Sequence, residues 1–447
     1  MEKRVKIETD KFLNKRVKII ADEDEEFEGV MLYSYDPSVI LLKLDNGYNI
    51  GIKKEKIKKI ELIRQERKKE KGEGEKKEEK GKRKEEKLKQ ARQKQKPKVA
   101  FIVTGGTIAS CLDYETGAVK PLTRAEEILQ IAPKISEIAE PVIECPFLVF
   151  SENINAEHFK KIAKIVESKL NDRSVQGVVV LSGTDTAHYI ASALAFMLGK
   201  INKPVVLTCS QRSIDRGSSD ALLNLTCSCY IALSDIAEVT LVSHASLSDE
   251  YCWCLRATKC RKMHTSRRDT FRPINSKPLA IVWPDGKIKI LQEYNKRSEG
   301  KVKAESFFEE KTALIKWHPN ADPALLEFLL KQGYKGVVIE ATGFGHVAIE
   351  GKFSWFNAIK KCVESGMIVA FAPQTLYGRL DPFVYETGRK LAKLGVLYLH
   401  DILPETAYIK LAWLLGKEKD KEKVKQLMLE NIANEFNFRL SSQDFLI

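Results

Sequence analysis

The amino-acid sequence predicts an α/β protein with a small N-terminal β-barrel of the SH3 or Sm type, followed by a two-domain α/β body. The barrel is predicted by five short apolar stretches within residues 1–63, separated by turn sequences. The body is predicted by continuous apolar runs that alternate with helical periodicity from residue 99 onward. We therefore expect a barrel domain at 1–63, a charged linker at 64–97, and α/β domains at 98–300 and 301–447.

The first segment has the pattern of an all-β domain with short strands. Turn signals separate the strands: the acidic run 22–24, the Asp36-Pro37 pair and the Asp45-Asn46-Gly47 triplet. Small barrels of this kind bind RNA or protein, or dock onto a larger body, and this one contains no visible catalytic constellation. The expected strands span 17–20, 29–33, 38–44, 49–53 and 57–63.

Residues 64–98 carry most of the excess positive charge. The whole chain has a formal net charge of +13, and this segment holds 17 Lys or Arg against 8 Glu, with no aromatic residue. Such a stretch cannot bury enough apolar surface to form a core, so a solvated helix or a disordered tether is the favoured interpretation. The alternative is a basic arm that adds salt-dependent affinity for RNA phosphates.

The composition is typical of a globular protein outside the membrane. Hydrophobic residues make up 43% and charged residues 30% of the 447 positions, which suits a sizeable core. The chain has no apolar run of about eighteen residues, and its N-terminal sequence MEKRVKIETD lacks the apolar stretch of a secretory signal. We therefore expect a cytoplasmic protein with no membrane contact.

The nine cysteines are an odd number, and in a cytoplasmic chain this favours reduced, buried thiols. The pairs Cys227/Cys229 and Cys252/Cys254 have C-x-C spacing, not the C-x-x-C spacing that suits tetrahedral zinc. A metal site at Cys252, Cys254 and Cys260 is conceivable from their proximity in sequence, but core thiols are the favoured interpretation. We expect no metal in this chain.

Hydroxyl and carboxylate side chains follow two expected strands of the first α/β domain. The run 99–103 ends in Thr104-Gly105-Gly106-Thr107, and the run 178–181 ends in Ser182-Gly183-Thr184-Asp185. In parallel sheets the chemistry lies at the carboxyl ends of the strands, so these side chains should meet. A third apolar run spans 204–208, and helical periodicity spans 159–170 and 188–198.

The second α/β domain is predicted by a shorter series of apolar runs. A helix at 404–416 closes it, with proline near the first turn and glycine near the end. The apolar run Leu411, Trp413, Leu414 and Leu415 is expected to form the buried face of that helix. The expected strands span 313–317, 336–340, 368–372 and 396–399.

The residues at the strand ends are suited to chemistry at a carbonyl group. A threonine hydroxyl is a weak nucleophile and needs a base, while glycines let backbone N–H groups approach an oxyanion. Asp185 places a carboxylate beside Thr184, and Lys262 completes a proton relay if it is desolvated and held by Asp185. Spacing alone also allows a phosphate-binding turn, a helix N-cap and a surface lysine. It does not say which of Thr104 and Thr184 is the nucleophile.

Two motifs resemble the defining motifs of L-asparaginases: V-T-G-G-T-I-A-S at 103–110 and L-S-G-T-D-T at 181–186. The resemblance extends from residue 97 to the C-terminus. It implies a homodimeric or tetrameric α/β enzyme without metal or organic cofactor. It assigns the nucleophile to Thr104, whose activation, together with that of the attacking water, falls to Thr184, Asp185 and Lys262.

The resemblance also implies a substrate-binding pair and a lid. Ser151-Glu152 corresponds to the family's Ser-Gln pair, which binds the α-carboxylate and α-ammonium of the substrate, and the added negative charge of Glu152 favours the ammonium. The family's lid tyrosine is replaced by Ala118 within residues 116–121, and Tyr114 is out of register.

Three further stretches and the N-terminal barrel resemble the D subunits of archaeal glutamyl-tRNA(Gln) amidotransferases. The stretches are D-Y-E-T-G-A-V at 113–119, S-Q-R-S-I-D-R-G-S-S-D-A at 210–221 and R-K-M-H-T-S-R-R-D-T-F-R at 261–272. This resemblance implies a glutaminase that passes ammonia to a partner, the E subunit of the same amidotransferase, which converts Glu-tRNA(Gln) to Gln-tRNA(Gln) with ATP and Mg²⁺. It also implies a homodimer within an α2β2 heterotetramer.

Two alternatives remain open. A free-standing L-asparaginase or glutaminase shares the catalytic motifs but does not explain the barrel or the stretch 261–272. An RNA-binding protein with an inactive hydrolase body does not explain the intact Thr104, Thr184, Asp185 and Lys262.

Overall fold

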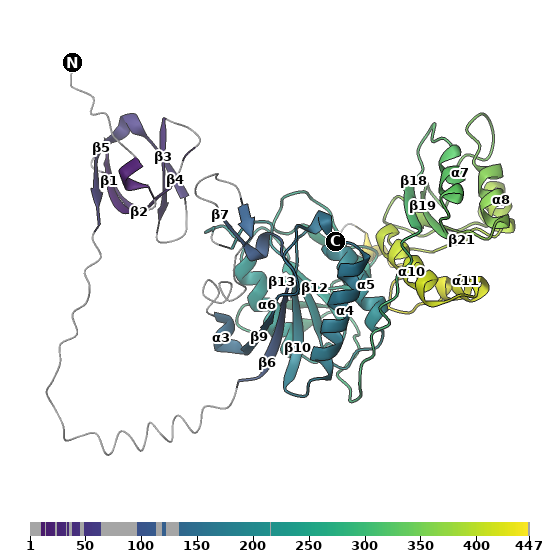
Figure 1. Cartoon of the computed structure of the whole chain (residues 1–447), viewed down its shortest axis with the longest axis horizontal. Helices are drawn as coiled ribbons and strands as arrows, with labels where there is room; N and C mark the ends of the chain where they lie inside the picture. The colour runs from purple at the N-terminus through teal and green to yellow at the C-terminus, as the bar shows by residue number, and fades with distance from the viewer. Residues whose placement is uncertain are drawn as a thin grey trace.

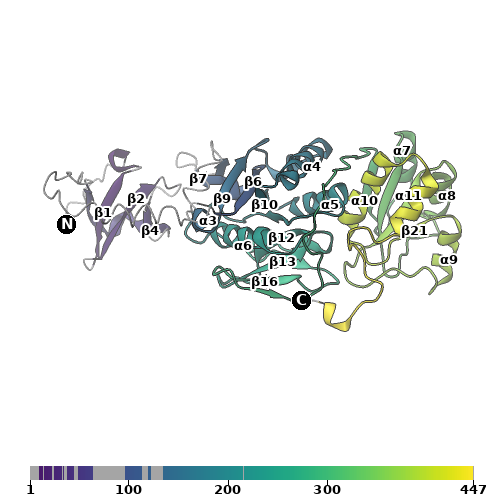
Figure 2. The same ribbon diagram turned by 90° about the horizontal axis from the view of Figure 1, so that it is seen from below.

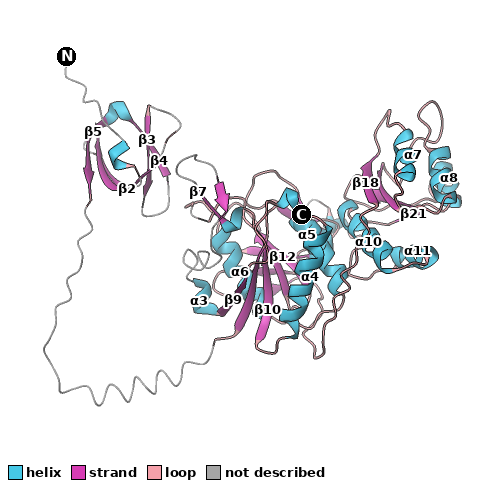
Figure 3. Ribbon diagram, viewed as in Figure 1, coloured by secondary structure: helices cyan, strands magenta, loops and turns pink. Residues whose placement is uncertain are grey.

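The computed structural model describes residues 10–13, 15–22, 25–32, 34, 38–44, 49–63, 96–112, 119–121, 134–214 and 216–445. Its elements are shown in chain order in Figure 1 and by type in Figure 3. Most of the predicted linker (64–95) and the segment 113–118, which includes Ala118 and Tyr114, lie outside the described residues. No helix in the described part of the chain is long and apolar enough to cross a membrane.

The N-terminal strands form an antiparallel sheet in the order β4-β3-β2-β1-β5. Apolar side chains alternate along the strands, so that Val17, Ile19 and Leu42 are fully buried on one face. The strands are β1 (Arg16–Ala21), β2 (Glu26–Leu32), β3 (Val39–Leu44), β4 (Asn49–Lys53) and β5 (Ile57–Leu62).

The predicted closed barrel is not confirmed, because this sheet is open. Strands β4 and β5 are its two edges, and no pairing joins them among the described residues. Turn spacing predicts the number of strands, whereas closure depends on the tilt and stagger of the strands, which spacing does not specify. Ile57 is the only buried residue along β5, so this edge strand contributes little to a closed interior.

The first α/β unit is built on an eight-stranded sheet in the order β17-β16-β13-β12-β11-β10-β6-β9. Its pairings are parallel from β9 to β12, as the continuous apolar runs indicate, and antiparallel from β12 to β17. The antiparallel extension was not predicted. The strands are β6 (Lys98–Val103), β9 (Glu140–Glu144), β10 (Val175–Leu181), β11 (Val205–Thr208), β12 (Val239–His244), β13 (Cys252–Arg256), β16 (Ala280–Val282) and β17 (Ile288–Ile290).

Helices cover both faces of this sheet. On β6, Ala100 and Ile102 belong to a core cluster that includes α4 and α5. The alternate residues Val99, Phe101 and Val103 belong to the cluster that includes α3 and α6. This alternation places one layer of helices on each face. The helices are α3 (Lys134–Ile138), α4 (Ala156–Asn171), α5 (Ala187–Leu198) and α6 (Ala221–Leu233).

The second α/β unit has a smaller parallel sheet in the order β18-β19-β20-β21. Its strands are β18 (Thr312–Lys316), β19 (Gly336–Ala341), β20 (Ile368–Pro373) and β21 (Leu397–Tyr398). Its helices are α7 (Ala324–Lys331), α8 (Phe356–Glu364), α9 (Glu386–Lys393), α10 (Pro404–Lys417) and α11 (Lys421–Leu429). Two short antiparallel ribbons belong to the first unit: β7 (Ser110–Leu112) with β8 (Val119–Pro121), and β14 (Cys260–Lys262) with β15 (Phe271–Pro273).

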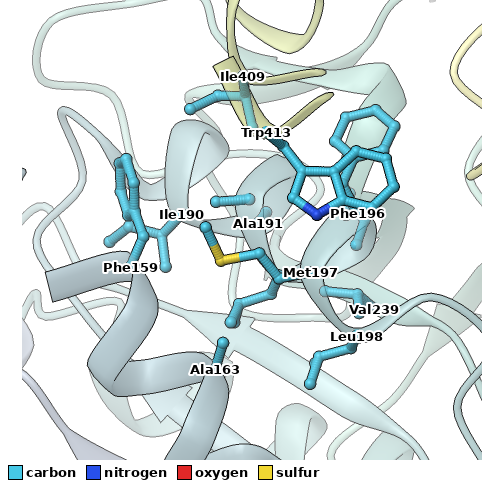
Figure 4. Packing of buried hydrophobic residues seen from close by; sticks show 14 of the residues in the cluster. Phe159, Ala163, Ile190, Ala191, Phe196, Met197, Leu198, Val239, Ile409 and Trp413 are labelled. Atoms are coloured by element: carbon cyan, nitrogen blue, oxygen red, sulfur yellow. The ribbon is translucent and has the colours of Figure 1, made fainter. Parts of the chain in front are cut away.

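Helix α10 joins the two α/β units. It packs against α5 on one side and against β18 and β19 on the other, and Figure 2 shows it between the two sheets. Trp413 of α10 stacks on Phe196 of α5, with ring centroids 5.8 Å apart, and Figure 4 shows both rings in one cluster with Ile409 and Met197. The two units therefore share a continuous apolar core.

A buried ion pair anchors the C-terminal segment to α10. Lys410 Nζ lies 2.5 Å from Glu435 Oε1, and both side chains are fully buried. The lysine also donates to the carbonyl of Met428, and the Glu435 carboxylate accepts the backbone N–H groups of Ile432 and Ala433. Burial lowers the pKa of Lys410, and the negative charge of Glu435 opposes that shift. The pair is thus satisfied on both sides, as a buried pair must be.

We predict that Lys410→Met lowers the free energy of unfolding by about 3–5 kcal/mol, because Glu435 would remain buried without its cation. Urea-induced unfolding of the whole chain measures this loss. The matched control is Lys425→Met, whose ion pair with Glu422 is exposed to solvent, and it should change stability by less than about 0.5 kcal/mol. Equal stability of the two variants would contradict the prediction.

Candidate active site

The site lies where the loops after β6 and β10 meet. Gly106 has a φ of +78°, and a Cβ atom there would lie 2.3 Å from the Cα of Gly183. A Cβ atom on Gly183 would lie 2.7 Å from Ser151 Oγ. Any side chain at either position would push the loops apart, so the close approach requires glycine at both.

Thr104 is buried at the end of β6, where it bridges three segments. Its hydroxyl donates to the carbonyl of Leu181 at 2.8 Å, and its backbone N–H donates to the same oxygen at 3.0 Å. Its own carbonyl accepts the N–H of Val149 at 3.1 Å. A carbonyl acceptor orients a hydroxyl but does not activate it. A hydroxyl held in this way would have to leave the bond before it could act as a nucleophile.

The loop after β10 is held by Lys262 from β14. Lys262 Nζ lies 2.7 Å from Thr184 Oγ1 and 2.6 Å from Asp185 Oδ1. The lysine side chain is 11% exposed, whereas the Asp185 side chain is 64% exposed. Since the threonine hydroxyl accepts from the ammonium, its own proton remains available for donation. This arrangement of a lysine, a carboxylate and a hydroxyl is what a proton relay requires.

Ser151 extends this network, and Glu152 lies beside it. Both residues lie in the single helical turn 151–153, where Ser151 is buried and Glu152 is exposed. Ser151 Oγ donates to Asp185 Oδ2 at 3.5 Å, the outer limit of a hydrogen bond, and its carbonyl accepts the hydroxyl of Thr186 at 2.8 Å. Thr184, Asp185, Lys262 and Ser151 are thus joined by hydrogen bonds.

Thr104 and Glu152 lie next to this hydrogen-bonded network and are not joined to it by the contacts of the described residues. Thr104 belongs to the loop that touches Gly183, and Glu152 is the chain neighbour of Ser151. The structure therefore brings four of the six predicted site residues into direct contact and places the other two on adjoining loops.

His188 is a buried neighbour that the sequence motifs did not identify. It lies in the first turn of α5 and is 6% exposed. Burial lowers its pKa to about 3, and the positive charges of Arg261 and Lys262 shift it in the same direction. A neutral imidazole adds no positive charge beside Lys262. The only signal in the sequence was its position three residues after Asp185. A histidine on an apolar helix face usually indicates core packing, so this signal did not single it out.

The residues that follow Lys262 form a turn organised by His264. The Nδ1 atom of His264 accepts the backbone N–H groups of Ser266 and Arg267 at 3.0 and 3.1 Å. Arg267 and Arg272 both bind the buried carboxylate of Asp269. These internal contacts give the turn a defined shape directly next to the lysine of the site.

The cysteines near this region belong to the apolar cores. Cys252 and Cys254 of β13 lie in the core cluster that includes α6, and Cys260 lies in the cluster that includes α5. Burial raises the pKa values of Cys254 and Cys260 to about 12, so both thiols are protonated at neutral pH. The described residues include no cluster of three metal-ligating side chains.

Comparison with known proteins identifies the class. The model of the asparaginase N-terminal domain matches residues 98–296, and that of the glutaminase/asparaginase C-terminal domain matches residues 311–428. The thermostable L-asparaginase from Thermococcus kodakarensis superposes with a TM-score of 0.68 at 28% identity, over 76% of this chain and 100% of that chain. L-asparaginase I from Vibrio cholerae superposes with a TM-score of 0.65 at 26% identity, over 77% of this chain and 100% of that chain. The body of the protein thus has the asparaginase fold.

Full-length relatives show to which family within the asparaginase fold the chain belongs. The chain is 46% identical to the D subunit of the glutamyl-tRNA(Gln) amidotransferase of Pyrococcus furiosus, over 96% of this chain and 95% of that one. It is also 46% identical to the protein of the same name from Thermococcus kodakarensis, over 94% and 92% of the two chains. The model of the GatD N-terminal domain matches residues 14–63. The chain belongs to the family of glutamyl-tRNA(Gln) amidotransferase D subunits.

We predict that Gly106→Ala lowers the free energy of unfolding by about 2–4 kcal/mol, through backbone strain and the clash with Gly183 together. The matched control is Gly199→Ala. Gly199 also has a positive φ, of +59°, but no atom lies within 4 Å of the added Cβ. It should lose only about 1 kcal/mol from strain. Urea-induced unfolding separates the two effects, and an equal loss in both variants would refute the close approach of the loops.

Proposed function

We propose that this chain is the glutaminase subunit of a tRNA-dependent amidotransferase. It hydrolyses the side-chain amide of glutamine and supplies ammonia to a partner that converts Glu-tRNA(Gln) to Gln-tRNA(Gln) with ATP. The observation that carries this proposal is the Lys262 ammonium bound to both Thr184 and Asp185 beside the Thr104 loop. Family membership supports the tRNA-dependent reaction, because the full-length relatives are named for it.

In the proposed reaction, Thr104 is the nucleophile. Its Oγ attacks the amide carbon of glutamine, and its proton passes to Thr184 while Thr184 gives a proton to Lys262 and Lys262 gives one to the Asp185 carboxylate, the final acceptor. Backbone N–H groups of the Gly105-Gly106 turn stabilise the oxyanion. The C–N bond then breaks, the relay returns the proton to the leaving ammonia, and a glutamyl ester remains on Thr104. A water activated through Thr184 hydrolyses that ester and releases glutamate.

Ser151 and Glu152 bind the α-carboxylate and α-ammonium of glutamine in this proposal. The buried Ser151 hydroxyl donates to the carboxylate of the substrate, and the exposed Glu152 carboxylate pairs with its ammonium. Asp185 lies within reach of Ser151 and adds a second negative charge for the ammonium. Together these charges select a free amino acid over a simple amide.

The partner in this proposal is the ATP-dependent E subunit of the amidotransferase, which also binds Mg²⁺ and Glu-tRNA(Gln). We place two copies of this chain and two copies of the E subunit in an α2β2 assembly in the cytoplasm. Ammonia released into bulk water would be protonated and lost, so coupling hydrolysis to an occupied acceptor site benefits the synthesis. The basic segment 64–98 is suited to bind tRNA phosphates.

A free-standing L-asparaginase is the second candidate. The likeness to the solved L-asparaginase from Thermococcus kodakarensis favours it. The two functions differ in their dependence on tRNA. The glutaminase of an amidotransferase should hydrolyse glutamine slowly alone and faster when the E subunit and Glu-tRNA(Gln) are added one at a time. Vigorous hydrolysis of asparagine that neither addition changes would support the second candidate instead.

We predict that Thr104→Ala lowers glutamine hydrolysis by about 10³-fold or more, because the ester intermediate cannot form. The assay measures ammonia from the chain with the E subunit and Glu-tRNA(Gln). The matched control is Thr208→Ala. Thr208 is also buried at the end of a parallel strand, where its hydroxyl donates to the carbonyl of Val242. The control should retain activity, and a Thr104→Ala chain that still hydrolyses glutamine would exclude this nucleophile.

We also predict that chelation separates the two half-reactions. The glutaminase site has no need of a metal ion, because threonine, lysine and carboxylate groups supply the nucleophile and the proton relay. EDTA should therefore leave ammonia release by this chain alone unchanged, while in the full assembly it stops the ATP-dependent formation of Gln-tRNA(Gln). A loss of ammonia release that added metal restores would refute this part of the proposal.

A further inference from the structure

Lys262 lies on a strand that has little support from its own sheet. Strand β14 has three residues, and its only strand neighbour among the described residues is β15. In this ribbon Lys262 pairs with Phe271, and Arg261 pairs with Arg272. An isolated two-stranded ribbon is marginal in water, so other contacts must hold β14 in place.

Those contacts come from the second α/β unit, at the start of α10. Arg261 Nη2 lies 2.9 Å from Glu405 Oε1, and the Glu405 side chain is 5% exposed. Lys259, just before β14, lies 2.6 Å from Asp401, and both side chains are fully buried. Two cations within the three residues before Lys262 are thus bound by two carboxylates, one three residues before α10 and one in its first turn.

The charged contacts are reinforced by neutral ones. The hydroxyl of Thr406, in the first turn of α10, donates to the carbonyl of Thr258, which lies just before Lys259. Asp401 also accepts the backbone N–H and the side-chain amide of Asn437. The anchoring carboxylate is therefore itself held by the C-terminal segment.

Neighbouring side chains of a strand point to opposite faces. Arg261 therefore points away from the face on which Lys262 reaches the loop after β10, and their contacts agree with this, since Arg261 binds Glu405 and Lys262 binds Thr184. Because Arg261 and Lys262 are adjacent on this strand, a displacement of Arg261 also displaces the Lys262 ammonium. Because relay groups must lie within hydrogen-bond reach, a shift of about 1 Å is enough to impair proton transfer.

We propose that Arg261 and Glu405 are positioning residues, through which the start of α10 holds the Lys262 ammonium against Thr184 and Asp185. This inference rests on the proposed glutaminase function. Glu405 is suited to the task because Arg261 is its only ion-pair partner among the described residues, and its second oxygen, Oε2, is buried there without a hydrogen-bond partner. Loss of either charge leaves the other partner unneutralised and frees the strand.

The test compares Glu405→Gln with Glu238→Gln in the full chain assembled with the E subunit and Glu-tRNA(Gln). Glu238 is a matched control: it is 7% exposed, it binds Arg256 at 2.9 Å, and this pair lies within the first α/β unit. Glu405→Gln should lower kcat for glutamine hydrolysis about 10- to 100-fold, with KM changed less than about 2-fold. Glu238→Gln should leave both constants unchanged.

A second measurement does not depend on activity. Limited reductive methylation followed by mass spectrometry gives the labelling rate of Lys262, which should rise several-fold in Glu405→Gln because the amine is no longer held. Equal kcat and equal labelling of Lys262 in the two variants would overturn the inference. If Glu405→Gln does not fold, Arg261→Lys is used in its place, because it keeps the charge but shortens the reach, and it should change both readouts in the same direction.

The two proposals fail in different ways. If the native assembly does not hydrolyse glutamine, the proposed function falls, and the labelling comparison still decides whether Glu405 positions Lys262. If native activity is high and Lys262→Met abolishes it, but Glu405→Gln matches Glu238→Gln in both measurements, only the positioning role is refuted.

Discussion

The candidate site depends on a contact between two glycines. Gly106 and Gly183 lie so close that neither can carry a side chain, and this contact brings the loop after β6 against the loop after β10. The parallel sheet makes the contact possible, because β6 and β10 are adjacent and end at the same edge. Ser151 packs against Gly183. The loop after β6, the loop after β10 and the turn at 151–153 therefore meet, in the described part of the chain, without any ion pair between them.

Lys262 adds a second constraint, which the sheet does not provide. It lies on a short ribbon outside the central sheet, and its position is set by residues of both α/β units. The apolar packing of α10 on α5 keeps the helix, and with it the ion pairs to Lys259 and Arg261, in a fixed position. Trp413 of α10 stacks on Phe196 of α5 and holds the helix against the first unit. Glu405, at the start of the helix, therefore lies beside β14, where it binds Arg261. Apolar packing thus holds the helix in place, and ion pairs connect it to β14 and to the residues just before β14.

Much of the fold could be predicted from local patterns. The expected apolar runs 99–103, 178–181 and 204–208 fall within or one residue outside β6, β10 and β11, and the expected helix 188–198 nearly coincides with α5. Burial on both faces leaves a continuous apolar run, and such runs are visible in a single sequence. The antiparallel extension by β13, β16 and β17 was missed because those strands are short and only partly apolar. Closure of the N-terminal sheet was predicted from strand spacing, which does not contain the information that decides closure.

The sequence by itself determined the chemistry available at the site: two threonines, an aspartate, a lysine and the glycines that bring two loops together. These choices are local, because nucleophilicity, charge and positive φ belong to individual residues. Only the tertiary structure decided that Lys262 bonds to Thr184 and Asp185, that His188 is neutral behind them, and that Arg261 reaches Glu405. Those contacts join residues from 77 to more than 140 positions apart, so they depend on how the two α/β units pack.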